Sequence, residues 1–332
     1  MTLYRVRHRA TAPFRAGRPA LAAVLALAVA WLAPAPAAAQ IGSERYSAMV
    51  VEARTGRVLV AANPDETRYP ASLTKMMTLY MLFDALQEGR VQLNTPIRMS
   101  EEAASRPPSK LGLPVGATLS VEQAILALVT KSANDVAAAV GEHLAGSEER
   151  FGQLMTMRAR AIGMTRTTFR NASGLPDPDN TTTARDMATL GLRLIRDHPT
   201  RYHYFGTVHF NWGRAMIRNH NRMLGDYEGA DGIKTGFIRD SGFNIVTSAI
   251  RDNVRLVGVT MGGSSWVERD RHMGALMDQG FAQMGVAPRA PSSIMAAAVP
   301  AVGAARAATA ARRAVPDRRA ATTRAAATQS RV

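Results

Sequence analysis

Short strand-like runs of hydrophobic residues lie near both ends of the central part of the chain. Residues 46–51 and 58–60 flank an Arg-Thr-Gly turn, which predicts a β-hairpin. The runs 243–250 and 254–261 flank Arg-Asp-Asn and predict a second antiparallel hairpin. The proline- and glycine-containing segment 91–119 predicts irregular structure with short strands.

Apolar residues recur at helical spacing between the two hairpins and after the second one. A helix is predicted to open at Pro70-Ala71-Ser72, because an apolar stripe continues to Phe83. Further helices are predicted over 121–131 with Ser120 as N-cap, from Thr183 to just before Pro199, and over 268–284. Strands at both ends with helices between them predict a layered α+β domain.

The first 39 residues have the pattern of an export signal. Five arginines and no acid lie in this segment, and an apolar run follows them at 21–32. Three alanines end at Ala39, directly before Gln40. A basic stretch, a short apolar stretch and small residues at the end predict a signal peptide cleaved after about Ala39, and hence a periplasmic or secreted protein. The alternative, a membrane anchor, needs roughly 20 apolar residues.

Composition removes several functional classes. The chain has no cysteine, which excludes disulfides, thiol nucleophiles and thiolate metal sites. Its net charge is +15, but residues 1–39 carry +5 and residues 289–332 carry +7, which leaves +3 for residues 40–288. The core is therefore nearly balanced, and no nucleic-acid partner is expected.

The domain boundaries follow from composition. Residues 40–288 can form one domain with a sizeable core. Residues 289–332 are rich in Ala, Arg, Pro and Thr and contain no aromatic residue, which predicts a disordered basic tail. Its arginines could bind anionic lipid headgroups or wall polymers, and a solvated tail without a partner is the alternative.

Only four lysines occur in the chain, and two of them stand in informative surroundings. Ser72-Leu73-Thr74-Lys75 places a hydroxyl and an amine one helical turn apart, within reach of a hydrogen bond. A serine hydroxyl needs an adjacent base to become a nucleophile, and a lysine that loses its solvation can be neutral enough to serve.

Two more motifs follow in order along the chain. Ser132-Ala133-Asn134 comes just after the helix predicted over 121–131, and Lys234-Thr235-Gly236 lies in a predicted strand. An ammonium and a hydroxyl on a strand suit a substrate carboxylate, and the glycine lets the substrate backbone lie close. The order S-x-x-K, S-x-N, K-T-G is the signature set of penicillin-binding proteins and class A β-lactamases.

Longer stretches around these motifs resemble the D-alanyl-D-alanine carboxypeptidase family of low-molecular-mass penicillin-binding proteins. The similar segments are residues 70–78, 174–176, 184–188 and 231–237, and the resemblance covers about residues 43–285. It implies a penicillin-binding, transpeptidase-like (β-lactamase-like) fold: an antiparallel sheet of about five strands flanked by helices, a helical subdomain, and a cleft between them.

The resemblance also implies a serine mechanism. Ser72 would attack the carbonyl between the two terminal D-alanines of a peptidoglycan stem peptide, and Lys75 would take its proton. Ser132 would lie on the proton path to the leaving amine, held with Asn134 and Lys234 in one polar network. Water would then hydrolyse the acyl-enzyme, and β-lactams would act as covalent inhibitors.

Substrate-binding residues follow from the same resemblance. Lys234 and Thr235 would receive the terminal carboxylate, with Gly236 beside them. Backbone N–H groups of Ser72 and Phe237 would form the oxyanion hole. No metal or organic cofactor is called for.

The chain departs from the family pattern in three places. Many members carry a C-terminal β-rich domain and an amphipathic membrane helix, for which the segment after Gly285 is too short and too polar. No C-terminal anchor is therefore expected. Phe237 stands where some relatives have a polar residue. His220 stands where some have arginine, and both a cleft role and a purely structural role stay open for it.

Other functions stay open or lose support. A D,D-endopeptidase that cuts crosslinks uses the same residues, and sequence separates it poorly from a carboxypeptidase. A class A β-lactamase needs a suitably placed glutamate, and Glu142, Glu148 and Glu149 lie too near the second motif. A non-catalytic wall-binding relative would have lost a motif residue. No H-E-x-x-H pattern supports a metallopeptidase, so the histidines at 198, 203, 209 and 220 are interpreted as surface and turn residues.

Overall fold

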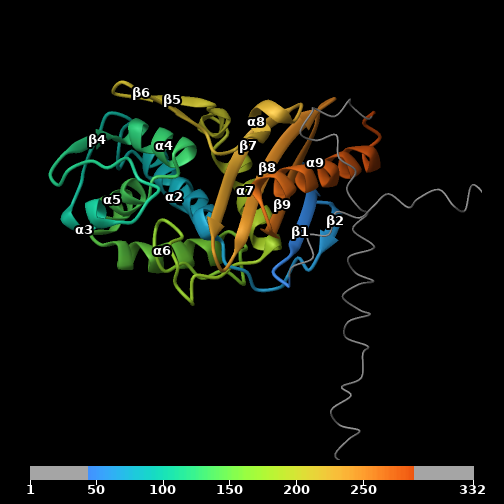
Figure 1. The fold of residues 1–332 in the computed structure, drawn as a ribbon, viewed down its shortest axis with the longest axis horizontal. Coiled ribbons are helices and arrows are strands. Elements are labelled where there is room, and N and C mark those ends of the chain that lie inside the picture. The colour runs from blue at the N-terminus through green and yellow to red at the C-terminus, as the bar shows by residue number, and fades with distance from the viewer. Residues whose placement is uncertain (1–43, 288–332) are drawn as a thin grey trace, which may run out of the picture. The chain divides into compact units, whose positions relative to one another are not determined.

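The computed structural model describes residues 44–287, so the predicted signal peptide and basic tail lie outside the described residues. Its centre is an antiparallel five-stranded sheet (Figure 1). In spatial order the strands are β2 (Val58–Ala62), β1 (Ser47–Glu52), β9 (Val254–Gly263), β8 (Gly242–Arg251) and β7 (Ala230–Ile238). The predicted five-stranded antiparallel sheet is therefore confirmed.

Both predicted hairpins form, each with residues suited to its turn. Gly56 has a φ of +77° in the turn between β1 and β2. Asp252 and Asn253, between β8 and β9, have φ values of +47° and +62°. Asn and Asp tolerate this left-handed region better than most residues, and two such residues connect strands with the right twist.

Helices cover both faces of the sheet. Helix α9 (Trp266–Gln283) packs on one face, where Met273 and Leu276 join Ala48 and Val50 in a hydrophobic cluster. Helix α7 (Ala184–Asp197) packs on the other face, and α2 (Lys75–Gln87) packs against α7 in the same hydrophobic cluster. The alternation of β1 explains the division, because successive side chains of a strand point to opposite faces.

A glycine lets α9 approach the sheet closely. A Cβ atom on Gly258 of β9 would lie 2.6 Å from the sulfur of Met273 and 2.7 Å from that of Met277. The glycine therefore leaves room for the side chains of Met273 and Met277 to lie directly on the backbone of β9.

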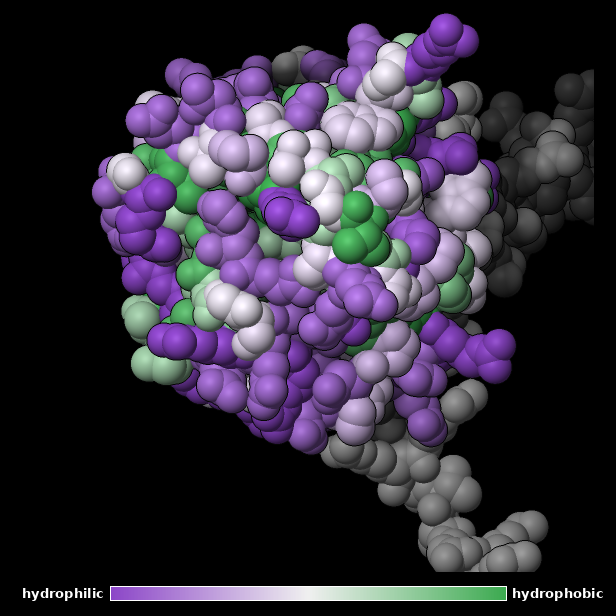
Figure 2. Space-filling view, turned by 90° about the vertical axis from the view of Figure 1, so that its left-hand side faces the viewer, coloured by the Kyte–Doolittle hydropathy of each residue, from purple (hydrophilic) through white to green (hydrophobic). Residues whose placement is uncertain are grey.

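The remaining helices form the subdomain beside α2. They are α3 (Glu101–Ser105), α4 (Val121–Thr130), α5 (Asn134–Ala145) and α6 (Glu148–Ala161). Ser120 is the N-cap of α4, as predicted, and the structure adds a capping box between Ser120 and Gln123. Figure 2 looks onto this end of the described domain, where hydrophilic side chains cover most of the surface and apolar ones are interspersed.

Short elements complete the described chain. They are β3 (Pro96–Arg98), β4 (Thr118–Ser120), β5 (His209–Trp212), β6 (Ala215–Arg218), α8 (Met223–Asp226) and the 3₁₀ turns η1 (Ala71–Thr74) and η2 (Tyr202–Gly206). The segment 91–119 holds two short strands, as predicted, together with the short helix α3. No helix among residues 44–287 is both long and apolar enough to cross a bilayer.

Candidate active site

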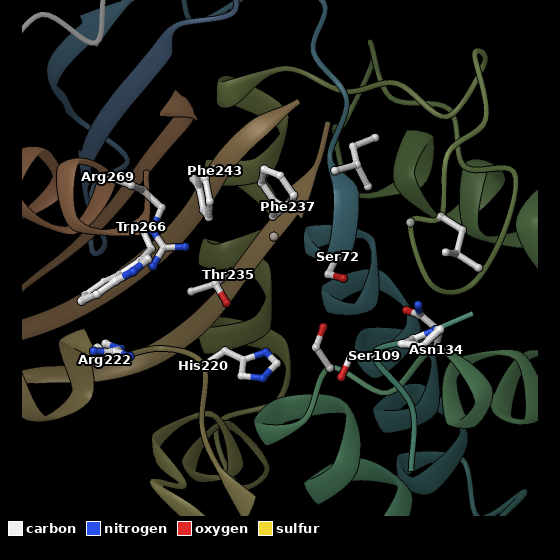
Figure 3. A pocket seen from close by; sticks show the side chains of 16 residues that line it. Ser72, Ser109, Asn134, His220, Arg222, Thr235, Phe237, Phe243, Trp266 and Arg269 are labelled. Atoms are coloured by element: carbon white, nitrogen blue, oxygen red, sulfur yellow. The ribbon is translucent and has the colours of Figure 1, made fainter. Parts of the chain in front are cut away.

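A cleft of about 400 Å³ opens between β7 and the helical subdomain (Figure 3). It is lined by parts of all three sequence motifs and by segments that the motifs do not mark. The lining residues are Ser72, Pro108, Ser109, Ser132, Asn134, Gly174, Leu175, His220, Arg222, Thr235, Gly236, Phe237, Ile238, Phe243, Trp266 and Arg269.

The turn that carries Ser72 differs from the α-helix start predicted from the sequence. Ser72 lies in the 3₁₀ turn η1, and the α-helix begins only at Lys75. The Asn244 side chain on β8 donates hydrogen bonds to the carbonyls of Tyr69 (3.0 Å) and Pro70 (3.2 Å). Its amide oxygen accepts from the N–H of Gly262 at 3.1 Å. Asn244 thus ties the turn before Ser72 to the sheet, a role that no sequence motif marked.

Lys75 is fully buried and has three hydrogen-bond partners. Its Nζ lies 3.1 Å from Ser72 Oγ, 2.7 Å from Asn134 Oδ1 and 2.6 Å from the carbonyl oxygen of Ser173. Burial, and secondarily the charge of Lys234, lower the pKa of Lys75 well below its ordinary value. The predicted serine–lysine contact and the predicted loss of solvation are both present in the structure.

Asn134 is fixed from both sides. Its side-chain amide donates to the carbonyl of Pro107 at 2.9 Å, which turns its oxygen toward Lys75. Its backbone N–H donates to the carbonyl of Ser109 at 2.7 Å. The loop 107–109 therefore holds Asn134 against the lysine.

Ser132 occupies a strained position after α4. Its φ is +58°, a left-handed value that is unusual for serine, and its side chain is only 5% exposed. Its hydroxyl makes no hydrogen bond within the described chain. A strained backbone and a free buried hydroxyl are typical of functional positions.

The predicted network of Ser132, Asn134 and Lys234 is not formed as expected. Asn134 bonds to Lys75, the hydroxyl of Ser132 has no partner among residues 44–287, and Lys234 donates to the carbonyl oxygen of Thr235 at 2.9 Å. The pairing of Asn134 depends on how the loop 107–109 packs, which motif spacing does not encode.

The K-T-G motif lies on the edge strand β7, beside the nucleophile turn. Lys234 is 1% exposed, and burial, followed by the charge of Arg269, lowers its pKa to about 7. A Cβ atom on Gly236 would lie 3.0 Å from both the carbonyl oxygen of Pro70 and the backbone nitrogen of Ser72. The glycine is needed here because β7 packs directly on the nucleophile turn.

Arg269 is a site residue that sequence reasoning missed. It projects from the first turn of α9 into the cleft beside Thr235 (Figure 3). Its guanidinium pairs with Asp270 at 2.7 Å and donates to the carbonyl of Asn244 at 3.3 Å. Burial lowers its pKa. The sequence predicted this helix, but nothing in its spacing indicated that Arg269 faces the cleft.

The structure places His220 on the cleft wall. Its surroundings lower its pKa to about 4, chiefly by burial and then through the charges of Lys234, Lys131 and Lys75. The imidazole is therefore neutral at pH 7. The interpretation of all four histidines as surface and turn residues is wrong for His198, which is buried with its Nε2 3.3 Å from Asp84.

Aromatic side chains form one rim of the cleft. Phe237 is 53% exposed and packs against Phe243, with 4.3 Å between the ring centroids and 32° between the ring planes. The exposed ring of Phe237, supported by the partly buried ring of Phe243, offers an apolar surface for part of a ligand.

Solved structures with the same fold define the class of this protein. Penicillin binding protein 5 from Haemophilus influenzae is 33% identical, with a TM-score of 0.69 over 71% of this chain and 70% of that chain. Penicillin-Binding Protein D2 from Listeria monocytogenes, solved in a cefotaxime-bound form, is 28% identical, with a TM-score of 0.65 over 71% of this chain and 96% of that chain. The fold is that of the penicillin-binding proteins.

The family follows from sequence comparison. The family model of peptidase S11, D-alanyl-D-alanine carboxypeptidase, matches residues 33–265, and the chain belongs to this family. The D-alanyl-D-alanine carboxypeptidase DacA of Haemophilus influenzae is 34% identical over 248 residues, which are 73% of this chain and 63% of that protein. The chain thus matches less than two thirds of the length of this relative.

Proposed function

We propose that this protein is a serine D-alanyl-D-alanine carboxypeptidase, which removes the terminal D-alanine from peptidoglycan stem peptides through an acyl-enzyme on Ser72. The observation that carries the proposal is the contact between Ser72 and the fully buried amine of Lys75. The family membership supports the same reaction.

The hydrogen-bond partners of Lys75 leave its lone pair directed at the hydroxyl of Ser72. A neutral amine has two N–H donors and one lone pair. The oxygens of Asn134 and Ser173 can only accept, so they take the two donors. The lone pair then remains for the hydroxyl proton of Ser72, which is the arrangement that a general base requires.

The proposed reaction has two steps, acylation of Ser72 and hydrolysis of the acyl-enzyme. As Ser72 Oγ bonds to the carbonyl carbon, its proton passes to Lys75. The C–N bond then breaks, and the leaving nitrogen of D-alanine takes a proton through Ser132, whose free hydroxyl suits a relay. Backbone N–H groups of Ser72 and Phe237 would stabilise the oxyanion. Water then hydrolyses the ester and restores Ser72.

Positive charge at one end of the cleft explains a preference for a chain end. Thr235 and Arg269 face this end, and Lys234 lies buried beneath the strand. A free carboxylate would compensate these charges, whereas an internal peptide bond carries none. Asn134 and Gly236 complete the proposed binding set by positioning Lys75 and by admitting the substrate backbone.

We expect the acyl-enzyme that a β-lactam forms on Ser72 to be hydrolysed slowly. The described lining of the cleft contains no carboxylate that could activate water on an acylated serine. Asp135, the buried acid that directly follows the S-x-N motif, accepts from the N–H groups of Leu111 at 3.0 Å and Gly112 at 2.8 Å. Glu148, also buried, is held by Arg106 at 2.6 Å and by the N–H of Ala172 at 2.9 Å. We therefore propose that β-lactams inhibit the protein covalently and are not efficiently destroyed.

The proposal includes export. A family that acts on the cell wall fits the predicted signal peptide ending near Ala39 and a periplasmic or secreted location. The predicted basic tail, residues 289–332, then carries its charge next to anionic lipid and wall polymers.

Intact-protein mass spectrometry after mixing with benzylpenicillin tests the proposal, with Ser72→Ala as the matched control. A stable adduct on the wild type alone, together with D-alanine release from a D-Ala-D-Ala peptide, is expected. An adduct on Ser72→Ala would contradict the assigned nucleophile. Rapid destruction of penicillin without an adduct would indicate a β-lactamase instead.

A further inference from the structure

The cleft continues beyond the place proposed for the terminal carboxylate. In the view of Figure 3 it runs from Ser72 past Thr235 to Trp266 and Arg222. The guanidinium of Arg222 lies 3.9 Å above the ring of Trp266. The two residues come from separate elements, because Arg222 directly precedes α8 and Trp266 is the first residue of α9.

The charge of Arg222 is available to a ligand. Its side chain is exposed, and within the described chain no carboxylate lies at salt-bridge distance from it. The nearby Asp270 is already paired with Arg269. A guanidinium stacked on an aromatic ring keeps its N–H donors free in its own plane. The stack thus fixes the arginine without consuming its hydrogen-bonding capacity.

The number of cations at this end exceeds what D-alanine needs. The leaving D-alanine has one carboxylate. The cations Lys234 and Arg269, together with the hydroxyl of Thr235, are enough to bind it. Arg222 is one cation more, and it lies farther from Ser72, on the leaving-group side of the cleft. Its natural counterpart is a second anionic group on the leaving residue.

We infer that Arg222 and Trp266 form a subsite for a leaving group larger than D-alanine, one whose side chain carries a second carboxylate. This inference rests on the proposed function. The chemistry is unchanged: Ser72 takes the acyl group, the C–N bond breaks, and the larger amine leaves with the proton. The subsite would therefore set which leaving residues the protein accepts, by favouring those with an acidic side chain over D-alanine itself.

Three peptides test the subsite. They share one acyl part ending in D-alanine and differ in the leaving residue: D-alanine, D-glutamate or D-glutamine. D-glutamate and D-glutamine have nearly the same shape, so the ratio of their kcat/KM values isolates the second charge. We expect the wild type to favour D-glutamate by about tenfold, as a charge-assisted contact supplies.

Variants assign the preference to the pair. Arg222→Ala is expected to bring the D-glutamate to D-glutamine ratio to about one. Arg218→Ala, which removes an exposed arginine outside the cleft lining, is expected to keep it near the wild-type value. Acylation by benzylpenicillin reports that each variant is folded.

The outcomes separate the two proposals. Hydrolysis of all three peptides with a wild-type ratio near one, or an unchanged ratio in Arg222→Ala, would overturn the subsite alone. No hydrolysis of any peptide and no penicillin adduct would overturn the proposed function and the subsite with it.

Discussion

Gly174 packs so closely on the nucleophile turn that a Cβ atom in its place would lie 1.8 Å from the carbonyl oxygen of Ala71. Its φ of +79° also belongs to the region that favours glycine. The residue before it, Ser173, supplies the carbonyl that accepts from Lys75. One contact between backbones therefore sets both the position of the nucleophile and one partner of the proposed base.

Gly174→Ala is accordingly expected to slow acylation by benzylpenicillin by at least about tenfold and to lower the free energy of unfolding by about 1–3 kcal/mol. Gly56→Ala is the matched control, with a φ of +77° but open space around its Cβ position. It should lose about 1 kcal/mol and keep its acylation rate. Denaturant unfolding and time-resolved mass spectrometry measure the two effects. Equal acylation rates in the two variants would refute the packing argument.

The two lysines of the cleft predict how activity depends on pH. Burial lowers the pKa of Lys75, so this base becomes free at a lower pH than an ordinary lysine, and its deprotonation contributes a rise of activity with pH. Lys234, with a pKa of about 7, loses its charge as pH rises further, and kcat/KM for a D-Ala-D-Ala peptide should then fall. Lys234→Arg keeps its charge and should lack this fall. A fall that persists in Lys234→Arg would assign it to another group.

Lys234 also lowers stability. A base whose pKa is lowered by folding loses protons that the unfolded chain keeps, so its cost is full at and below about pH 7 and vanishes toward pH 10.5. Lys234→Met should abolish peptidase activity yet raise the free energy of unfolding at pH 7 by about 1–3 kcal/mol. Denaturant unfolding across this pH range checks the sign. A gain that grows with pH would contradict the assignment.

Phe237 is expected to contribute to recognition of apolar acyl groups. Phe237→Ala keeps the backbone N–H proposed for the oxyanion hole but removes the exposed ring that packs against Phe243. Acylation by benzylpenicillin should slow several-fold relative to acylation by 6-aminopenicillanic acid, which lacks the phenyl side chain. Equal slowing with both compounds would mean that the ring supports acylation in general and does not recognise the phenyl side chain.

Features that depend on local spacing could be predicted from the sequence. The two hairpins, α4 with its cap at Ser120, and the contact between Ser72 and Lys75 all depend on residues close together in the chain. Periodicity and turn chemistry report such relationships directly.

Features that depend on packing between distant segments could not be predicted in this way. Asn244 reaches the turn before Ser72 across 175 residues, counted to Tyr69. Arg269 and the stack of Arg222 on Trp266 meet the cleft only because α9 docks on the sheet. The partner of Asn134 was mistaken for the same reason, since the loop 107–109 decides it.

The place of β1 in the sheet has a consequence for when the site comes into being. Strand β1, near the start of the described chain, lies between β2 and β9, and β9 is the last strand within residues 44–287. The turn carrying Ser72 is likewise held by β7 and β8. Long-range pairings of this kind form late in folding. The turn that carries Ser72 therefore cannot take up its place in the site before β7, β8 and β9 have been synthesised and have paired.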